Sequence, residues 1–246
     1  MKTELKNYWN FGKTMDLGPY PRNTELQFSI SDLDNEEWFN KLPASDWVRD
    51  SFDYKYNSQG FRSREYEVTD NSMLLSLGCS HTVGVGVPFE TIWSEQLYQK
   101  FTPDYKVYNA AAGGASADTI ARFAVNIIPI MKPKIVAILW PSLNRFESYC
   151  HGDAKNNTRY NGPWETDNFS FQFEDNNIYN NKTKNKLILT LLQKIYNFTL
   201  LELDMDDIFS KYSKIKFSKA RDQQHFGPDW HKQISEDFYS IYLKTL

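Results

Sequence analysis

Residues 74–87 read LLSLGCSHTVGVGV, a stretch in which an apolar strand-like run ends at Gly78 to His81. Its first residues, with the methionine before them, form an apolar run of the length of a buried β-strand. The run ends at Gly78, and Gly84 and Gly86 follow closely. A tight turn from a strand into a helix explains the glycines, because glycine adopts backbone conformations that other residues avoid. A nucleophile presented at the end of a strand would also explain Ser80.

Strand-like and helix-like patterns alternate after this stretch. Three further segments have the length and apolar content of buried strands: KVYNAA (106–111), KIVAILW (134–140) and TLLELD (199–204). Two segments between them have apolar residues near helical spacing: TIWSEQLYQKF (91–101) and SADTIARFAVNIIPIM (116–131). In the second, Ser116 suits the N-cap, and Pro129 predicts the end of the helix or a kink. Strands that alternate with helices predict a parallel sheet with helices on both faces.

The segments around this core are less regular. We expect residues 1–70 to form an irregular extension packed on the domain, with a short helix at WFNKL (38–42) and a hairpin or turn around Asn57–Gly60. Within a domain of residues 71–246, residues 148–182 predict an insertion, because they are rich in Asn, Asp, Gly and aromatic side chains.

Two helices are expected in the C-terminal part. KNKLILTLLQKIYNF (184–198) has a helical pattern, and Pro228 suits the first turn of a terminal helix. That helix has one apolar stripe, formed by Trp230, Ile234, Phe238 and Ile241.

Composition limits the classes of protein that this chain can be. Its 246 residues suffice for one sizeable domain, and 41% hydrophobic with 24% charged residues is ordinary for a globular protein. A formal net charge of −3 gives no electrostatic reason to expect a nucleic acid or an anionic membrane as a partner. No apolar run is long enough to span a bilayer, and MKTELKNYWNFGK lacks the apolar stretch of a signal peptide. With Cys79 and Cys150 as its 2 cysteines, we expect reduced thiols and a cytoplasmic protein.

Chemically useful side chains follow three predicted strands and precede the last helix. Reactive groups of parallel α/β proteins gather at the carboxyl ends of strands, and Ser80 stands at one of them. Asp222 could hold the imidazole Nδ1–H of His225 and leave Nε2 free to take a proton from a hydroxyl. Gly114, in NAAAGGASAD, could bring an N–H close to a ligand. Asn144, in WPSLNRFE, could donate its amide to an oxyanion.

Each of these features has a simpler explanation when it is taken alone. Glycines serve tight strand–helix turns, Asn144 could cap a helix, and Asp222 and His225 could be polar residues of a surface loop. Their order along the chain, at successive strand ends, is the informative observation.

The four blocks, in this order, resemble the SGNH hydrolases, the superfamily of GDSL-type esterases and lipases. Gly78–Ser80 stands where the family has its Gly-Asp-Ser nucleophile block, and Asn109–Gly114 matches the block with the oxyanion glycine. Ser142–Arg145 stands in place of Gly-x-Asn-Asp, and Asp222–His225 matches Asp-x-x-His. The matched stretches are short and are distributed across the catalytic half of the chain.

The resemblance implies a three-layer α/β/α, flavodoxin-like fold with a central, mainly parallel sheet, and a serine esterase that uses no cofactor. In the implied mechanism Ser80 attacks an ester carbonyl, His225 is the general base and Asp222 orients the imidazole. The N–H groups of Ser80 and Gly114 and the amide of Asn144 would hold the oxyanion.

Three residues depart from the family's pattern. Cys79 replaces an Asp, Ser142 replaces a Gly, and Arg145 replaces the Asp after the Asn. None of these changes removes a catalytic atom, so we expect a divergent branch with an unfamiliar substrate.

The roles of several neighbouring side chains stay open. Cys79 could itself be the nucleophile, although its place at the end of a strand favours the core. His81, Gly113 and Arg145 are candidates for substrate binding. A zinc site at the two C-terminal histidines lacks a clear third ligand, so no metal is expected.

The leading hypothesis is hydrolysis of an O-acyl ester of a small molecule or carbohydrate, such as an O-acetyl sugar. Aromatic side chains of the insertion would suit stacking on sugar rings: Tyr149, Tyr160, Trp164, Phe169 and Phe171. One alternative is a catalytically silent binding module on the same fold, against which the retained Asp222 and His225 argue. Another is an O-acyltransferase, in which an acceptor alcohol replaces water; nothing in the sequence separates it from a hydrolase.

Overall fold

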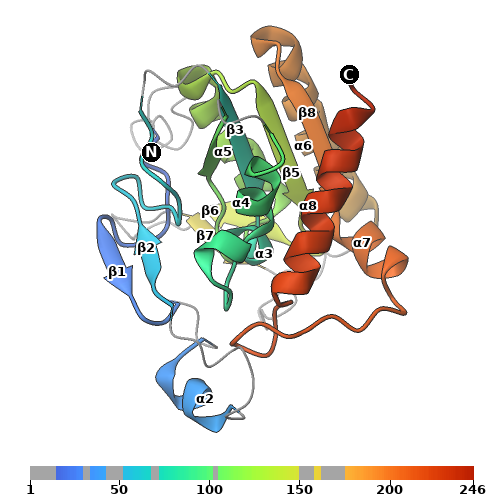
Figure 1. Cartoon of the computed structure of the whole chain (residues 1–246). Helices are drawn as coiled ribbons and strands as arrows, with labels where there is room; N and C mark the ends of the chain where they lie inside the picture. Colours follow the sequence, from blue (N-terminus) through green and yellow to red (C-terminus); the bar gives the residue numbers. More distant parts are fainter. Residues whose placement is uncertain are drawn as a thin grey trace.

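The computed structural model describes residues 15–29, 34–42, 52–67, 72–101, 105–149, 158–161 and 175–246. A four-stranded parallel sheet lies at the centre, in the order β4–β3–β5–β8 (Figure 1). Its strands are β3 (Met73–Gly78), β4 (Lys106–Asn109), β5 (Ile135–Trp140) and β8 (Thr199–Asp204). They coincide with the four apolar runs, and their order is that of the first four strands of a flavodoxin-like sheet.

Helices cover both faces of this sheet, so the expected three-layer α/β/α class is confirmed (Figure 1). One face carries α5 (Ala117–Met131) and α6 (Asp175–Tyr196). The other carries α4 (Trp93–Tyr98), α7 (Met205–Lys211) and α8 (Pro228–Leu243). Within the part of the chain that the structure describes, no helix is long and apolar enough to cross a membrane.

The sequence of strand β3 is almost continuously apolar because both faces of the strand are buried. All of its residues are buried. Leu75 and Leu77 belong to the apolar cluster under α5 and α6, whereas Leu74 belongs to the cluster under α4 and α8. A strand packed on both faces needs apolar side chains at successive positions, not at alternate ones.

The predicted helix boundaries around the sheet are close to those observed. Ser116 caps α5 through a capping box with Thr119, and Pro129 lies in the last turn of that helix. Pro228 is the first residue of α8, whose residues Trp230, Ile234 and Phe238 are buried against the sheet. The short helix expected near residue 38 is α2 (Glu36–Lys41).

Around Asn57–Gly60 the structure has the turn and not the hairpin. Strand β2 (Tyr54–Tyr56) pairs antiparallel with β1 (Thr24–Leu26). The carbonyl groups of Gln59 and Gly60 accept hydrogen bonds from the N–H groups of Gly18 and Tyr20, at 3.0 and 3.2 Å. Residues far upstream therefore occupy the partners that a local hairpin would use.

The region after β5 differs from the predicted insertion of residues 148–182 and from the helix predicted at residues 184–198. Strand β6 (Phe146–Tyr149) pairs antiparallel with β7 (Thr158–Asn161), at the start of the predicted insertion. Helix α6 begins at Asp175, well before the helical pattern of residues 184–198. Its first turns are rich in Asn and Lys, so they lack the apolar spacing by which a helix is recognised.

Candidate active site

Ser80 is the first residue of α3 (Ser80–Val83), directly after β3 and its neighbour Cys79. A Cβ added to Gly78 would lie 2.0 Å from the Thr82 Oγ1 atom, so this turn requires glycine. The Cys79 carbonyl oxygen accepts the N–H groups of Thr82 and Val83 at 2.8 and 3.0 Å, and the strand passes into the helix without a loop. The Ser80 hydroxyl is thereby presented at the carboxyl end of β3.

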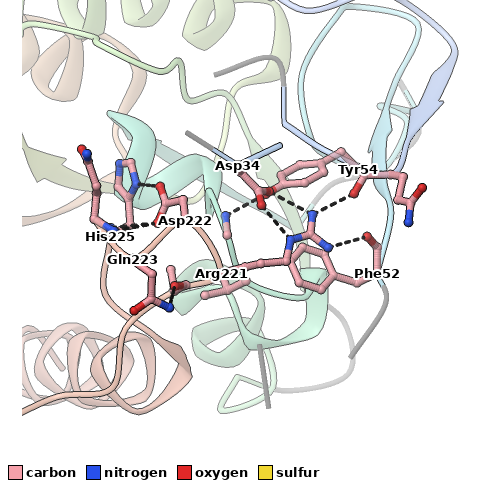
Figure 2. A network of polar contacts seen from close by, with 12 residues as sticks. Asp34, Phe52, Tyr54, Arg221, Asp222, Gln223 and His225 are labelled. Carbon is pink, nitrogen blue, oxygen red and sulfur yellow. Dashed lines mark hydrogen bonds and ion pairs between the residues drawn. The ribbon is translucent and has the colours of Figure 1, made fainter. Parts of the chain in front are cut away.

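His225 lies between Ser80 and Asp222. Its Nε2 atom is 2.7 Å from Ser80 Oγ. Its Nδ1 atom makes a hydrogen bond with Asp222 Oδ2 (Figure 2). The other carboxylate oxygen, Oδ1, accepts the N–H groups of Gln224 and His225 at 3.1 and 3.0 Å. The structure thus brings together the serine, histidine and aspartate that the sequence singles out.

The environment of Asp222 favours its charged form. Burial by itself raises the pKa of this carboxyl. The hydrogen bond and charge of His225, together with the N–H groups of His225 and Gln224, outweigh burial and hold the pKa below its ordinary value. An ionised Asp222 keeps the proton of a neutral His225 on Nδ1, which leaves Nε2 as an acceptor for the Ser80 hydroxyl.

Two of the three expected oxyanion donors are backbone groups at neighbouring strand ends. Gly114 has a φ of +72° in the turn between β4 and α5. Among the described residues, the N–H groups of Ser80 and Gly114 donate no hydrogen bond, so both are available to a ligand. Asn144 follows β5 and lines a cavity of about 290 Å³ with Arg145 and Asn181. None of the contacts in the described part of the chain joins Asn144 to Ser80.

The three candidates for substrate binding have different surroundings. His81 is buried, and its ring centroid lies 4.8 Å from that of His225. Burial holds the pKa of His81 well below its ordinary value, so the ring is neutral. The N–H of Gly113 donates to the Tyr20 hydroxyl at 2.8 Å and is therefore occupied. Arg145 is partly exposed beside Asn144.

Cys79, the competing nucleophile, and His231 are both buried. Cys79 is 0% exposed and belongs to the core cluster under α5, as its position in the strand favours. His231 accepts the N–H of Trp93 on Nδ1 at 3.2 Å. In the described ranges, no group of three or more His, Cys, Asp or Glu side chains is arranged to hold a metal ion.

Sequence reasoning missed the side chains that hold the loops of this site. Arg62 is buried and donates to the carbonyl oxygens of Val83, the last residue of α3, and of Gly84 and Val87 after it. Asn109, at the end of β4, donates its amide to the Thr82 carbonyl oxygen at 2.7 Å. These partners are backbone carbonyls, so no pattern of side chains along the chain reveals them.

No family model and no curated protein matches the chain, but solved structures do. The esterase EstA from Pseudoalteromonas sp. is 14% identical, with a TM-score of 0.39 over 71% of this chain and 100% of that one. A G-D-S-L family protein from Desulfitobacterium hafniense DCB-2 is 18% identical, with a TM-score of 0.35 over 68% of this chain and 97% of that one.

A two-domain esterase active on acetylated mannans is 17% identical, with a TM-score of 0.39 over 71% of this chain and 49% of that one. The chain therefore spans about half the length of that protein. The names of these proteins are those of esterases and of a G-D-S-L family protein, and identities and TM-scores this low carry no argument about this chain. The geometry described above comes from the side chains of this chain.

Proposed function

We propose that the chain is a divergent SGNH hydrolase, a serine esterase that cleaves an O-acyl ester through an acyl-enzyme. One observation carries the proposal: His225 Nε2 lies 2.7 Å from Ser80 Oγ while Asp222 holds Nδ1. An imidazole held in this way can take the hydroxyl proton as the oxygen attacks a carbonyl carbon.

The reaction proceeds in two steps at Ser80. Its Oγ attacks the ester carbonyl as His225 Nε2 takes the proton, and the oxyanion accepts the N–H groups of Ser80 and Gly114. Asn144 is assigned as the third donor. His225 then protonates the leaving alcohol, and the acyl group stays on Oγ. Water, activated by the same imidazole, attacks the acyl-enzyme, releases the acid and restores the serine.

We propose a short acyl group rather than a long one. Ser80 is 8% exposed and His81 beside it is 9% exposed, so little open surface surrounds the hydroxyl. Acetyl esters are therefore the first substrates to test. A carbohydrate as the alcohol part stays a prediction, since the side chains of Tyr149, Tyr160 and the aromatic residues up to Phe171 lie outside those described.

The decisive experiment is labelling with a fluorophosphonate, followed by peptide mass spectrometry and by turnover of p-nitrophenyl acetate. We expect the label on Ser80. Ser80→Ala should abolish labelling and lower turnover by about three orders of magnitude or more, because loss of a triad serine removes the covalent route.

Cys79→Ala is the matched control, because it deletes the neighbouring nucleophile and leaves the hydroxyl. It should keep both label and turnover. Well-folded protein that takes no label at Ser80 contradicts the esterase and favours a silent binding module. A label that moves to Cys79 would contradict the assignment of the nucleophile.

A further inference from the structure

A closed ring of four buried residues lies beside the triad. Asp34, Tyr54 and Arg221 of this ring are seen in Figure 2. Asp34 and Tyr54 come from the N-terminal extension. Gly86 comes from the loop after α3, and Arg221 directly precedes Asp222. The ring therefore connects three segments that are far apart in the sequence.

Each side of the ring is a hydrogen bond or an ion pair. Arg221 Nε and Nη2 donate to the two Asp34 carboxylate oxygens at 2.7 and 2.9 Å. The Tyr54 hydroxyl donates to Asp34 Oδ2 and accepts the N–H of Gly86, the latter at 2.7 Å. The Gly86 carbonyl oxygen accepts the backbone N–H of Arg221 at 2.8 Å, which closes the ring.

Two members of the ring belong to the loops that carry the triad. Gly86 lies in the loop that follows the helix of Ser80. A Cβ added to Gly86 would lie 3.0 and 3.2 Å from the backbone nitrogen atoms of Arg221 and Asp222. The ring therefore joins the segment of the serine to the segment of the aspartate.

The side chain of Arg221 has partners besides Asp34. Its guanidinium also donates to the Gln27 carbonyl oxygen at 2.7 Å, and it lies 3.9 Å from the centroid of the Phe52 ring. Both Arg221 and Asp34 have side chains that are 1% exposed. A buried ion pair adds little net stability over a well-packed apolar pair, so a role in geometry accounts for it better than a role in stability.

We propose that Asp34 and Arg221 are positioning residues for the triad. Through the ring they hold the Asp222 carboxylate on His225 Nδ1, and so keep Nε2 on the Ser80 hydroxyl. The N-terminal extension is then a working part of the active site. This inference rests on the proposed esterase function.

Three substitutions test the ring, one mild and two that alter the Asp34–Arg221 ion pair. Tyr54→Phe removes only the hydroxyl between Asp34 and Gly86. Arg221→Lys keeps the charge and loses the two-pronged geometry. Asp34→Asn removes the charge that the guanidinium faces. We expect kcat for p-nitrophenyl acetate to fall by about 10-fold in Tyr54→Phe and by about 100-fold in the other two, with KM within about twofold.

The pH profile separates positioning from mere folding. A carboxylate that is displaced from His225 stabilises the imidazolium less, so the acid limb of kcat/KM should move to lower pH in all three variants. Arg64→Gln is the matched control. Arg64 is also in the extension and pairs with the buried carboxylate of Glu95, in α4, which is outside both loops. It should change the unfolding temperature and leave kcat and the pH profile as in wild type.

A wild-type kcat and pH profile in both Tyr54→Phe and Arg221→Lys overturns the inference, whatever happens to the unfolding temperature. If the wild type shows no turnover, the esterase proposal fails. The ring is then tested by proton NMR of the hydrogen-bonded His225 Nδ1–H. Loss of that resonance in Asp34→Asn but not in Arg64→Gln supports positioning, and its retention in both overturns it.

Discussion

Gly86 shows how much of this site depends on the backbone of a single residue. Its φ is +76°, a conformation that side chains with a Cβ rarely adopt. Its carbonyl oxygen and its N–H both belong to the ring. A Cβ added to Gly86 would lie only 2.8 Å from the Cβ atom of Ala220. A second glycine of the same loop, Gly84, has nearly the same φ of +75° but faces the Ile92 side chain instead.

We predict that Gly86→Ala destabilises the protein by about 1–3 kcal/mol and also lowers kcat, because it strains the backbone and separates the two triad loops. Gly84→Ala carries the same backbone strain without touching the loop of Asp222. Urea unfolding and p-nitrophenyl acetate turnover compare the two. Equal losses of kcat in both variants would count against a specific role of Gly86.

At the scale of single residues, the sequence singles out Ser80, Asp222 and His225, which the structure brings together, but not the residues that support them. Ser80, Asp222 and His225 are recognisable because each has a fixed neighbourhood of a few residues. Arg221 is next to Asp222, but its partner Asp34 is 187 residues away, and no local pattern joins them. Asn144 is recognisable as an amide after a strand, whereas its place relative to Ser80 depends on the turn that follows β5.

Among the elements, α8 packs against a residue next to Ser80 and against the start of α4. Its residue Trp230 lies against His81, with ring centroids 5.2 Å apart, and His231 receives the Trp93 N–H at the start of α4. Burial first, and then the charges of His225 and Arg62, lower the pKa of His231 from 6.5 to about 3, although Asp229 opposes them. This helix contact is therefore made by a neutral imidazole.

A lowered histidine pKa makes the fold sensitive to acid. The unfolded chain takes up a proton on His231 below its ordinary pKa of 6.5, whereas the folded chain does so only near 3, so stability falls as the pH falls through this window. Between about pH 7 and about pH 4.5 the loss from His231 should be about 2–3 kcal/mol.

His231→Asn tests this, because the Asn Oδ1 atom can accept the Trp93 N–H and does not titrate. Urea unfolding at the two pH values should show a smaller acid loss in the variant than in wild type. The same acid loss in both proteins would show that His231 is not the source.

Helices and strands can be predicted from the local sequence where their apolar residues recur at a regular spacing. The four sheet strands and the stripe of α8 are predicted for that reason. The first turns of α6 and the pairing of β2 with β1 are not, because their stabilising partners lie elsewhere in the chain. A hydrophilic helix start such as Asp175 carries no periodic signal, and a strand of three residues can pair with any edge that is free.

For the molecule as a whole, the described residues up to Glu67 and the sheet with its helices are joined through buried polar contacts. Arg62 and Asp34 reach into the two loops of the triad, and Ser63 Oγ accepts the N–H of Asn109 at 2.9 Å. Buried polar groups lose their partners if either part opens alone. The described part of the extension should therefore unfold together with the sheet.

We predict one cooperative unfolding transition, seen at the same urea concentration by far-ultraviolet circular dichroism and by tryptophan fluorescence. Native-state hydrogen exchange should give the N–H groups of Gly86 and of Leu75, in β3, similar opening energies. An extension that opens in a separate, earlier transition would contradict this and would leave the triad exposed to partial disorder.

The span of the Asp34–Arg221 pair has a consequence for the order of events during synthesis. Ser80 and Asp34 leave the ribosome long before Arg221, Asp222 and His225 exist, so the early chain holds a nucleophile without a base and a carboxylate without its cation. Helix α8, which covers one face of the sheet, follows shortly after His225. On the proposed esterase function, catalytic competence therefore arises only when residues 221–225 have been made, and a nascent chain that lacks them is inert toward esters.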